Sequence, residues 1–328
     1  MKNSRPTYQV VMATYNGARY LNSQISSILS QLEDGELLIH DDGSSDDSVA
    51  ILESWSKVDS RVKLIYAPHC GSAAKNFSYL LSLTDAPYVL CADQDDVWPA
   101  GRLRTLISWA CFYESVYGDD VPLLIHGNLR VVNQNGECIS DSFWDYQNLK
   151  PEWGDKFNLL LTQNVVTGCA MIVNRELLNR ALPVPSDISM HDHWLALVAC
   201  GQGRVVWVND VVTNYRQHTS NVVGAHRYNY RFIIKRLTLS NNNEMVIREG
   251  LERKNYYNTA LHYARRFPIR QESESAAEFG QLDHVTLLRR ITIILSRGFF
   301  KNGTWRLFVW ILQPRKYVDL LTKWSRGT

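Results

Sequence analysis

The chain has 328 residues and a formal net charge of +2. A chain of this length can bury one large core, and apolar and charged fractions of 45% and 21% exclude an intrinsically disordered protein. Residues 1–225 carry 25 acidic and 16 basic side chains, which excludes a nucleic-acid-binding protein because a phosphate backbone needs a basic surface.

The first hundred residues alternate between strand and helix patterns. Four short apolar runs, typical of buried strands, are separated by segments whose apolar side chains recur at helical spacing: YQVVMATY, GELLIH, VKLIYA and PYVLCA. Ser44 and Asp47 fit a capping box for the helix after the second run. Strands joined by single helices pair in parallel, so the sequence predicts an α/β fold with a doubly wound, mostly parallel sheet and helices on both faces.

Beyond about residue 120 the pattern becomes mixed. The Asn135-Gly136 turn predicts a hairpin, CAMIV, VVWV and VVTNY predict three further strands, and a helix is expected around residues 193–200. After residue 225 the sequence predicts mainly helix, interrupted by the polar stretch 271–280.

The six cysteines are spread along the chain without a C-x-x-C pair, which favours reduced thiols and a cytoplasmic protein. The opening residues, MKNSRPTYQV, lack the apolar core of a signal peptide, and no charge-free apolar stretch reaches the roughly 20 residues of a spanning helix. We therefore expect a protein made and kept inside the cell.

Polar clusters follow three of the predicted parallel strands. They are Thr14-Tyr15-Asn16-Gly17, Asp41-Asp42-Gly43 and Asp93-Gln94-Asp95-Asp96. Ligands of such sheets bind beyond the carboxyl ends of the strands, so we expect the three clusters to meet at one edge.

The third cluster has two interpretations. Several carboxylates within four residues repel one another unless a cation lies among them, and hard oxygen ligands suit Mg²⁺ or Mn²⁺ held together with substrate phosphates. The alternative is a solvated acidic turn that caps the next helix. Asp41 likewise suits a hydrogen bond from a nucleotide base or ribose, with helix capping as its alternative.

Seven segments, taken in chain order, resemble glycosyltransferase family 2, an inverting family with the GT-A fold. They are VVMATYNG, LLIHDDGSSDDS, GSAAKN, VLCADQDDVW, TGCAMIVNREL, MHDHWLAL and NYRQHTSN. The residue types are most similar to the bacterial rhamnosyltransferase-like branch. The resemblance implies a catalytic domain over residues 1–225, with a nucleotide-sugar half (1–118) and an acceptor half (119–225), and an extension over residues 226–328.

The same resemblance implies roles for individual residues. Nucleotide-sugar binding is expected of Thr14, Tyr15, Asn16, Asp41, Lys75, Asp93 and Asp95. The expected ligands of Mg²⁺ or Mn²⁺ are Asp95, His218 and Asp93, with Asp95 the favoured direct ligand. Asp192 falls at the position of the catalytic base.

Asp192 lies in a His-Asp-His triplet that has two other interpretations. A zinc site with His218 is disfavoured, because His191 and His193 would point apart on a helix and no cysteine supports them. In the other, the polar triplet caps a helix whose apolar side chains pack in the core. The position that matches the family favours the base.

Three residues are expected on the acceptor side: Trp144, Gly168 and Asn128. Trp144 could stack on a sugar ring, although a buried core position suits a tryptophan equally well. Where related sequences often have a Ser-Asp pair, this chain has Gly127-Asn128, which puts an acceptor contact from Asn128 in doubt.

The C-terminal residues are basic and apolar together. Residues 287–328 carry nine basic side chains and one acidic side chain among aliphatic and aromatic residues. Such segments lie in the interface of an anionic membrane, or they pack as an ordinary helical extension. The first interpretation predicts a peripheral protein on the inner face of the cytoplasmic membrane.

Together these features predict an inverting, metal-dependent glycosyltransferase. The expected donor is a nucleotide-sugar, with dTDP-L-rhamnose as the candidate, and the expected acceptor is a hydroxyl of a lipid-linked glycan in bacterial O-antigen, capsule or other surface polysaccharide synthesis. The alternatives are a non-catalytic nucleotide-sugar or glycan-binding module of the same fold, and a glucosyl- or galactosyl-type transferase. A nucleotidyltransferase is disfavoured, because VVMATYNG is not a glycine-rich phosphate loop.

Overall fold

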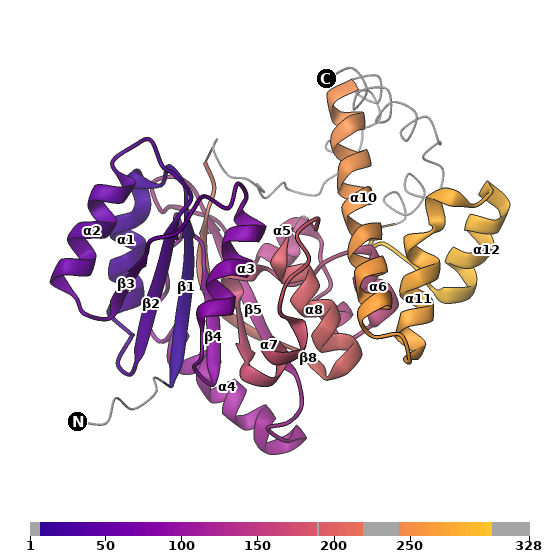
Figure 1. Ribbon diagram of the computed structural model, residues 1–328, viewed down its shortest axis with the longest axis horizontal. Coiled ribbons are helices and arrows are strands. Elements are labelled where there is room, and N and C mark those ends of the chain that lie inside the picture. The colour runs from indigo at the N-terminus through magenta and orange to yellow at the C-terminus, as the bar shows by residue number, and fades with distance from the viewer. Residues whose placement is uncertain (1–6, 189, 219–242, 304–328) are drawn as a thin grey trace.

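The computed structural model describes residues 7–188, 190–218 and 243–303 (Figure 1). An eight-stranded sheet forms its centre, with the strand order β3-β2-β1-β4-β7-β5-β6 and β8 paired with β5. The strands are β1 (Tyr8–Thr14), β2 (Gly35–Asp41), β3 (Val62–Ile65), β4 (Tyr88–Ala92), β5 (Leu123–Val132), β6 (Cys138–Ser140), β7 (Met171–Asn174) and β8 (Arg204–Arg216).

The first four strands are parallel, as predicted. The second half of the sheet is mixed, because β7 pairs antiparallel with both β4 and β5, while β8 runs parallel to β5. The predicted hairpin is also confirmed: β5 pairs antiparallel with β6, and Gly136 in their turn has a φ of 88°. The carboxyl ends of β1, β2 and β4 therefore lie at one edge.

Helices cover both faces of the sheet, and apolar side chains form a core on each side. The helices of the sheet region are α1 (Ala18–Leu29), α2 (Ser48–Val58), α3 (Ala73–Leu83), α4 (Arg102–Tyr117), α5 (Phe143–Gln147), α6 (Phe157–Thr162), α7 (Arg175–Ala181) and α8 (His191–Gln202). Residues of α1, α2 and α4 pack in one core, and residues of α3, α6, α7 and α8 pack in the other. The mixed α/β architecture predicted from the sequence is confirmed.

The described residues after β8 include the helices α10 (Asn243–Arg266), α11 (Gln271–Gly280) and α12 (Leu287–Arg297). The polar stretch predicted to interrupt the helices is itself helix α11, so that prediction was wrong. Small side chains and Phe279 form its buried face, and the Phe279 ring lies 5.1 Å from that of Tyr257 on α10. The predicted boundary at residue 225 and residues 304–328 of the tail lie outside the described residues.

The described part of the extension packs on the sheet region. The Asn158 side chain donates to the carbonyl of Arg297 (2.8 Å), the Thr162 hydroxyl donates to the carbonyl of Phe300 (2.5 Å), and the backbone N–H of Asn302 donates to the Gln163 side chain (2.9 Å). In Figure 1, α10, α11 and α12 stand beside α6 and α8, at the opposite end of the molecule from α2 and β3.

Two local predictions differ from the structure. The Ser44–Asp47 capping box does not form, because the Ser44 hydroxyl donates to Asp41, and the side chain of the helix N-cap Asp47 accepts no hydrogen bond. The expected strands VVWV and VVTNY form one strand, β8, whose register shifts against β5 at residues 127–129. A Cβ atom at Gly127 would lie 2.8 Å from the carbonyl oxygen of Asp210, so glycine is needed for this close approach.

Candidate active site

Hydrogen bonds join the three strand-end loops. The Gln94 side chain accepts from the backbone N–H of Tyr15 (2.8 Å) and donates to the carbonyl of the same residue (3.0 Å), so the loop after β4 is held against the end of β1. Asn16, at a φ of 50°, accepts from the backbone N–H of Ser45 (2.8 Å) and donates its own N–H to the Ser44 hydroxyl (2.7 Å). The expected meeting of the three clusters at one edge is confirmed.

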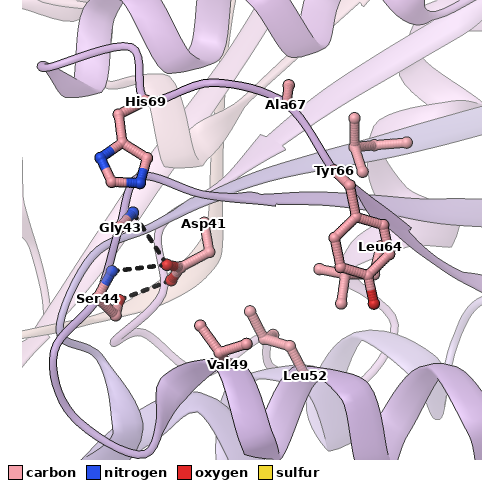
Figure 2. Close-up of a pocket in the computed structure, with 10 residues that line it drawn as sticks. Asp41, Gly43, Ser44, Val49, Leu52, Leu64, Tyr66, Ala67 and His69 are labelled. Carbon is pink, nitrogen blue, oxygen red and sulfur yellow. Dashed lines mark hydrogen bonds between the residues drawn. The ribbon is translucent and has the colours of Figure 1, made fainter.

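A pocket of about 380 Å³ opens beside the second cluster (Figure 2). It is lined by Asp41, Gly43, Ser44, Val49, Leu52, Leu64, Ile65, Tyr66, Ala67 and His69. Its walls combine aliphatic side chains with an exposed tyrosine ring and polar groups at one end, a combination that suits a flat heterocycle.

Asp41 lies at the polar end of this pocket, and its carboxylate accepts hydrogen bonds from the loop that follows β2. It accepts from the Ser44 N–H (2.7 Å), the Ser44 hydroxyl (2.6 Å) and the Gly43 N–H (3.1 Å) (Figure 2). It also accepts from the Thr14 hydroxyl (2.8 Å). These bonds fix the shape of the pocket's rim. Contact between Asp41 and a base stays a prediction.

Lys75 is exposed in the first turn of α3, whose N-cap Ser72 accepts from the Lys75 N–H (3.4 Å). Its ammonium charge lies close enough to Cys70 to oppose the rise that burial causes in the pKa of that thiol. A cation is thus available on the α3 side of the strand-end edge.

Asp95 and His218 meet although 123 residues separate them in the chain. The His218 Nε2 lies 2.7 Å from the Asp95 Oδ2, and both side chains are nearly buried, at 10% and 13% exposed. Their pairing places an imidazole nitrogen and a carboxylate oxygen together, as the two expected metal ligands require.

Asp93 lies with a different set of groups. Its carboxylate clusters with Asp96 and Cys169, within 4.8 Å of one another. Burial, with the charge of Asp95 next, raises the pKa of Asp93 to about 7, and the same causes raise the pKa of Asp96 well above its usual range. Asp96 points inward and accepts from the Arg216 N–H (2.9 Å), so it is a buried structural carboxylate.

A buried guanidinium lies next to these carboxylates. Arg102, only 2% exposed, stacks on the Trp98 ring at 3.8 Å and donates to the Thr213 hydroxyl (2.5 Å). Burial lowers its pKa to about 10, so it stays charged. The repulsion by the charge of Asp95 that helps to raise the pKa of Asp93 and Asp96 would be relieved by a divalent cation held by oxygen and imidazole ligands.

Asp192 lies at the start of α8 and is 6% exposed. It accepts from the Gly168 N–H (3.1 Å), the Asn164 side chain (3.1 Å) and the His193 N–H (2.6 Å). Burial raises its pKa to about 6 against the opposing effect of these bonds. Cys169, which lies with Asp93, directly follows Gly168, so the two carboxylates lie in one region.

The neighbouring histidines do not join Asp192 in a metal site. The His191 ring stacks on Phe77 with centroids 4.2 Å apart, and the His193 Nε2 lies 2.9 Å from the carbonyl of Leu160. The two rings point to different elements, as the sequence predicted for a helix.

The three acceptor-side residues have structural contacts. Trp144 is 5% exposed and packs edge-on against His126, so its stacking on a sugar finds no support here. Asn128 is 6% exposed; it donates to the Ser142 hydroxyl (3.0 Å) and accepts from its neighbour Leu129 (2.9 Å). Gly168 acts through its N–H, which holds Asp192, and a Cβ there would lie 3.0 Å from the His191 ring.

Four supporting residues were missed from the sequence: Gln94, Arg102, Asn164 and Tyr20. Gln94 had a signal, since an amide between two carboxylates at a strand end can bond to a neighbouring loop. The other three depend on partners that are distant in the chain. Asn164 bonds to Asp192, Arg102 bonds to Thr213, and Tyr20 stacks on His218.

The chain is similar in sequence to known glycosyltransferases. A family model described as glycosyl transferase family 2 matches residues 9–181. The chain is 26% identical over 246 residues to the dTDP-rhamnosyl transferase RfbG of Shigella flexneri, covering 70% of this chain and 79% of that protein. It is 30% identical over 172 residues to the UDP-Glc:alpha-D-GlcNAc-diphosphoundecaprenol beta-1,3-glucosyltransferase WfgD of Escherichia coli. That match covers 52% of this chain and 61% of WfgD.

Solved structures show the same fold at low sequence identity. The S. aureus TarS fragment in complex with UDP aligns with a TM-score of 0.52 and 15% identity, over 88% of this chain and 78% of that chain. The mannosyltransferase PcManGT from Pyrobaculum calidifontis, in complex with GDP-Man and Mn²⁺, aligns with a TM-score of 0.52 and 15% identity. This alignment covers 99% of this chain and 81% of PcManGT.

Proposed function

The chain belongs to glycosyl transferase family 2, and we propose that it moves a sugar from a nucleotide-sugar to a hydroxyl of a lipid-linked glycan, with inversion, during bacterial surface polysaccharide synthesis. The candidate donor is dTDP-L-rhamnose. RfbG, which matches this chain over 79% of its own length, is named a dTDP-rhamnosyl transferase. The name of WfgD specifies a diphosphoundecaprenol-linked acceptor.

The observation that carries this proposal is the placement of Asp192. Burial raises the pKa of Asp192 to about 6, which suits a proton acceptor that works near neutral pH. Asp192 is held by the Gly168 N–H and the Asn164 amide, in the region of Asp93. This pre-organised geometry favours a catalyst over a binding module.

The reaction then follows from the positions of these groups. The acceptor oxygen attacks the anomeric carbon from the face opposite the diphosphate, and the bond between that carbon and the β-phosphate oxygen breaks. Asp192 takes the hydroxyl proton, and the nucleoside diphosphate leaves with the bonding electrons. A direct displacement of this kind inverts the anomeric centre and needs no covalent intermediate.

The donor would lie along the strand-end edge. The pocket beside Asp41 takes the base, the loop of Tyr15 and Asn16 borders the ribose, and Lys75 supplies positive charge toward the diphosphate. Asp95 and His218 would hold Mg²⁺ or Mn²⁺, with Asp93 behind them, and the bound ion would stabilise the negative charge that develops on the diphosphate.

The identity of the donor is tested by the full chain's thermal stability. We expect one nucleotide-sugar of a panel of dTDP-, UDP- and GDP-sugars to raise the melting temperature, and to do so more strongly with Mn²⁺, because a ligand that binds only the folded state stabilises it by mass action. dTDP-L-rhamnose is expected to give the largest shift. A larger shift with UDP-glucose or UDP-galactose would instead assign a glucosyl- or galactosyl-type transferase. No shift with any of them would contradict nucleotide-sugar binding.

An exposed apolar stripe on α12 supports attachment to a membrane surface. Within residues 7–188, 190–218 and 243–303, no helix combines the length and apolar composition of a membrane span. Leu288 and Leu295 are 80% and 61% exposed and lie two turns apart on one face of α12, while Arg290 and Ile294 are buried. Such a helix lies in the plane of a membrane interface.

Replacing Leu288 and Leu295 together by aspartate should reduce flotation of the full chain with anionic liposomes. Each leucine buried in the interface contributes about 1.5–3 kcal/mol, and the new charges add repulsion from the lipid. Ile269→Asp is the matched control, because Ile269 is 96% exposed but lies outside α12. Unchanged flotation of the double variant would show that α12 is not the attached face.

A further inference from the structure

The ring of Tyr20 on α1 contacts the His218 imidazole and two arginines. The Tyr20 and His218 rings stack with their centroids 4.9 Å apart and their planes at 26°. The guanidinium carbon of Arg216 lies 5.0 Å from the centre of the Tyr20 ring, and that of Arg19 lies 5.2 Å from it. Tyr20 is half-buried and lies outside the residues to which the donor, metal and base were assigned.

Arg216 ties this ring to the loop that carries Asp95. Its Nε donates to the carbonyl of Asp95 (2.8 Å), its Nη1 donates to the carbonyl of Gln134 (2.9 Å), and its backbone N–H donates to Asp96 (2.9 Å). The guanidinium is therefore fixed at two side-chain atoms, and a fixed cation over an aromatic face holds that ring in place.

The contact between His218 and Asp95 depends on the orientation of the imidazole. A histidine side chain has two rotatable bonds, and most of its rotamers would carry Nε2 away from the Asp95 carboxylate. Because the Tyr20 ring is itself held, stacking on it restricts the plane of the His218 imidazole. In this orientation the His218 Nε2 lies 2.7 Å from the Asp95 Oδ2. Contacts of this kind behind a ligand decide how well it presents its donor atom to a metal.

We propose that Tyr20 is a positioning residue of the metal site: its ring, held by Arg216, fixes the His218 imidazole beside Asp95. This rests on the proposed metal site formed by Asp95 and His218. The flat ring is the required feature, so phenylalanine should replace tyrosine at this position and an aliphatic side chain should not.

The test measures Mn²⁺ binding to the full chain directly, by the loss of the free-ion signal in electron paramagnetic resonance, without nucleotide or turnover. We expect Tyr20→Leu and Tyr20→Ala to weaken Mn²⁺ affinity by about tenfold, and Tyr20→Phe to stay within about twofold of the wild type. Tyr20→Leu retains most of the apolar volume of the side chain, and circular dichroism melting curves check that each variant is folded.

A double variant separates positioning from a general effect on the fold. If Tyr20 acts through His218, Tyr20→Leu should cost no further affinity in a His218→Ala background. If Tyr20→Leu binds Mn²⁺ as tightly as the wild type, Tyr20 is not a positioning residue. The same follows if Tyr20→Leu weakens Mn²⁺ binding in the His218→Ala background as much as it does in the wild type. Either result leaves the metal assignment itself untouched. If His218→Ala itself binds Mn²⁺ as the wild type does, the metal assignment fails and the positioning role falls with it.

Discussion

Asp192→Asn should lower the rate of sugar transfer by about a thousandfold, within the range that a positioned general base contributes. The amide keeps the size of the side chain, and its one oxygen can still accept from Asn164 and the His193 N–H, which share one carboxylate oxygen of Asp192. It loses the bond from the Gly168 N–H to the other oxygen, and it cannot take a proton from the acceptor hydroxyl. The loss is therefore expected in kcat, with donor affinity unchanged, as measured by steady-state kinetics with the donor that the thermal-shift panel selects.

The pH dependence of the wild type follows from the same residue. The base works only when it is deprotonated, and burial raises the pKa of Asp192 to about 6. The transfer rate should be nearly constant above that pH and fall about tenfold per unit below it, as expected for one essential base. This acid limb should be absent from the residual activity of Asp192→Asn.

Asp187→Asn is the matched control. Asp187 is 57% exposed and its carboxylate contacts His262, away from the strand-end edge. Its variant should retain wild-type kinetics. Transfer at the wild-type rate by Asp192→Asn would show that Asp192 is not the base, whatever the behaviour of the control.

Asp95→Ala should lower metal-dependent transfer by at least about a hundredfold, since a Lewis acid contributes several kcal/mol to stabilising the leaving diphosphate. The substitution removes the carboxylate that His218 approaches at 2.7 Å. We also expect the additional stabilisation that Mn²⁺ gives to the donor complex to disappear from the melting curve.

Asp141→Asn provides the comparison for Asp95→Ala. Asp141 is also a paired carboxylate, but it is 82% exposed and bonds to Arg130 on the surface. It should keep both activity and Mn²⁺ dependence. Full activity of Asp95→Ala would refute the assignment of the metal to this residue.

The sequence predicted the site at the level of strand ends. Parallel strands bring their carboxyl ends to one edge, so the clusters after β1, β2 and β4 had to meet there. The preference for Asp95 over Asp93 as metal ligand came from the family resemblance. In the structure, Asp95 lies beside His218 and Asp93 lies with Asp96 and Cys169; the metal roles themselves stay predictions.

What the sequence could not predict depends on distant partners or on small side chains. Asn209-Asp210 looks like a turn between two strands, but the bulge opposite Gly127 accommodates both residues within β8. Helix α11 has few large apolar residues, and its buried face includes Ser273 and Ala276, which give no apolar periodicity. Neither feature leaves a pattern within a short window of sequence.

Asp192, the proposed catalytic base, is connected to the C-terminal helices. Asn164, whose side chain donates to Asp192, donates its backbone N–H to the Tyr256 hydroxyl of α10 (3.3 Å). The family model ends at residue 181, before Asp192, His218 and Tyr256. A change at Tyr256 would therefore reach the proposed base through Asn164 without touching the residues that line the pocket beside Asp41.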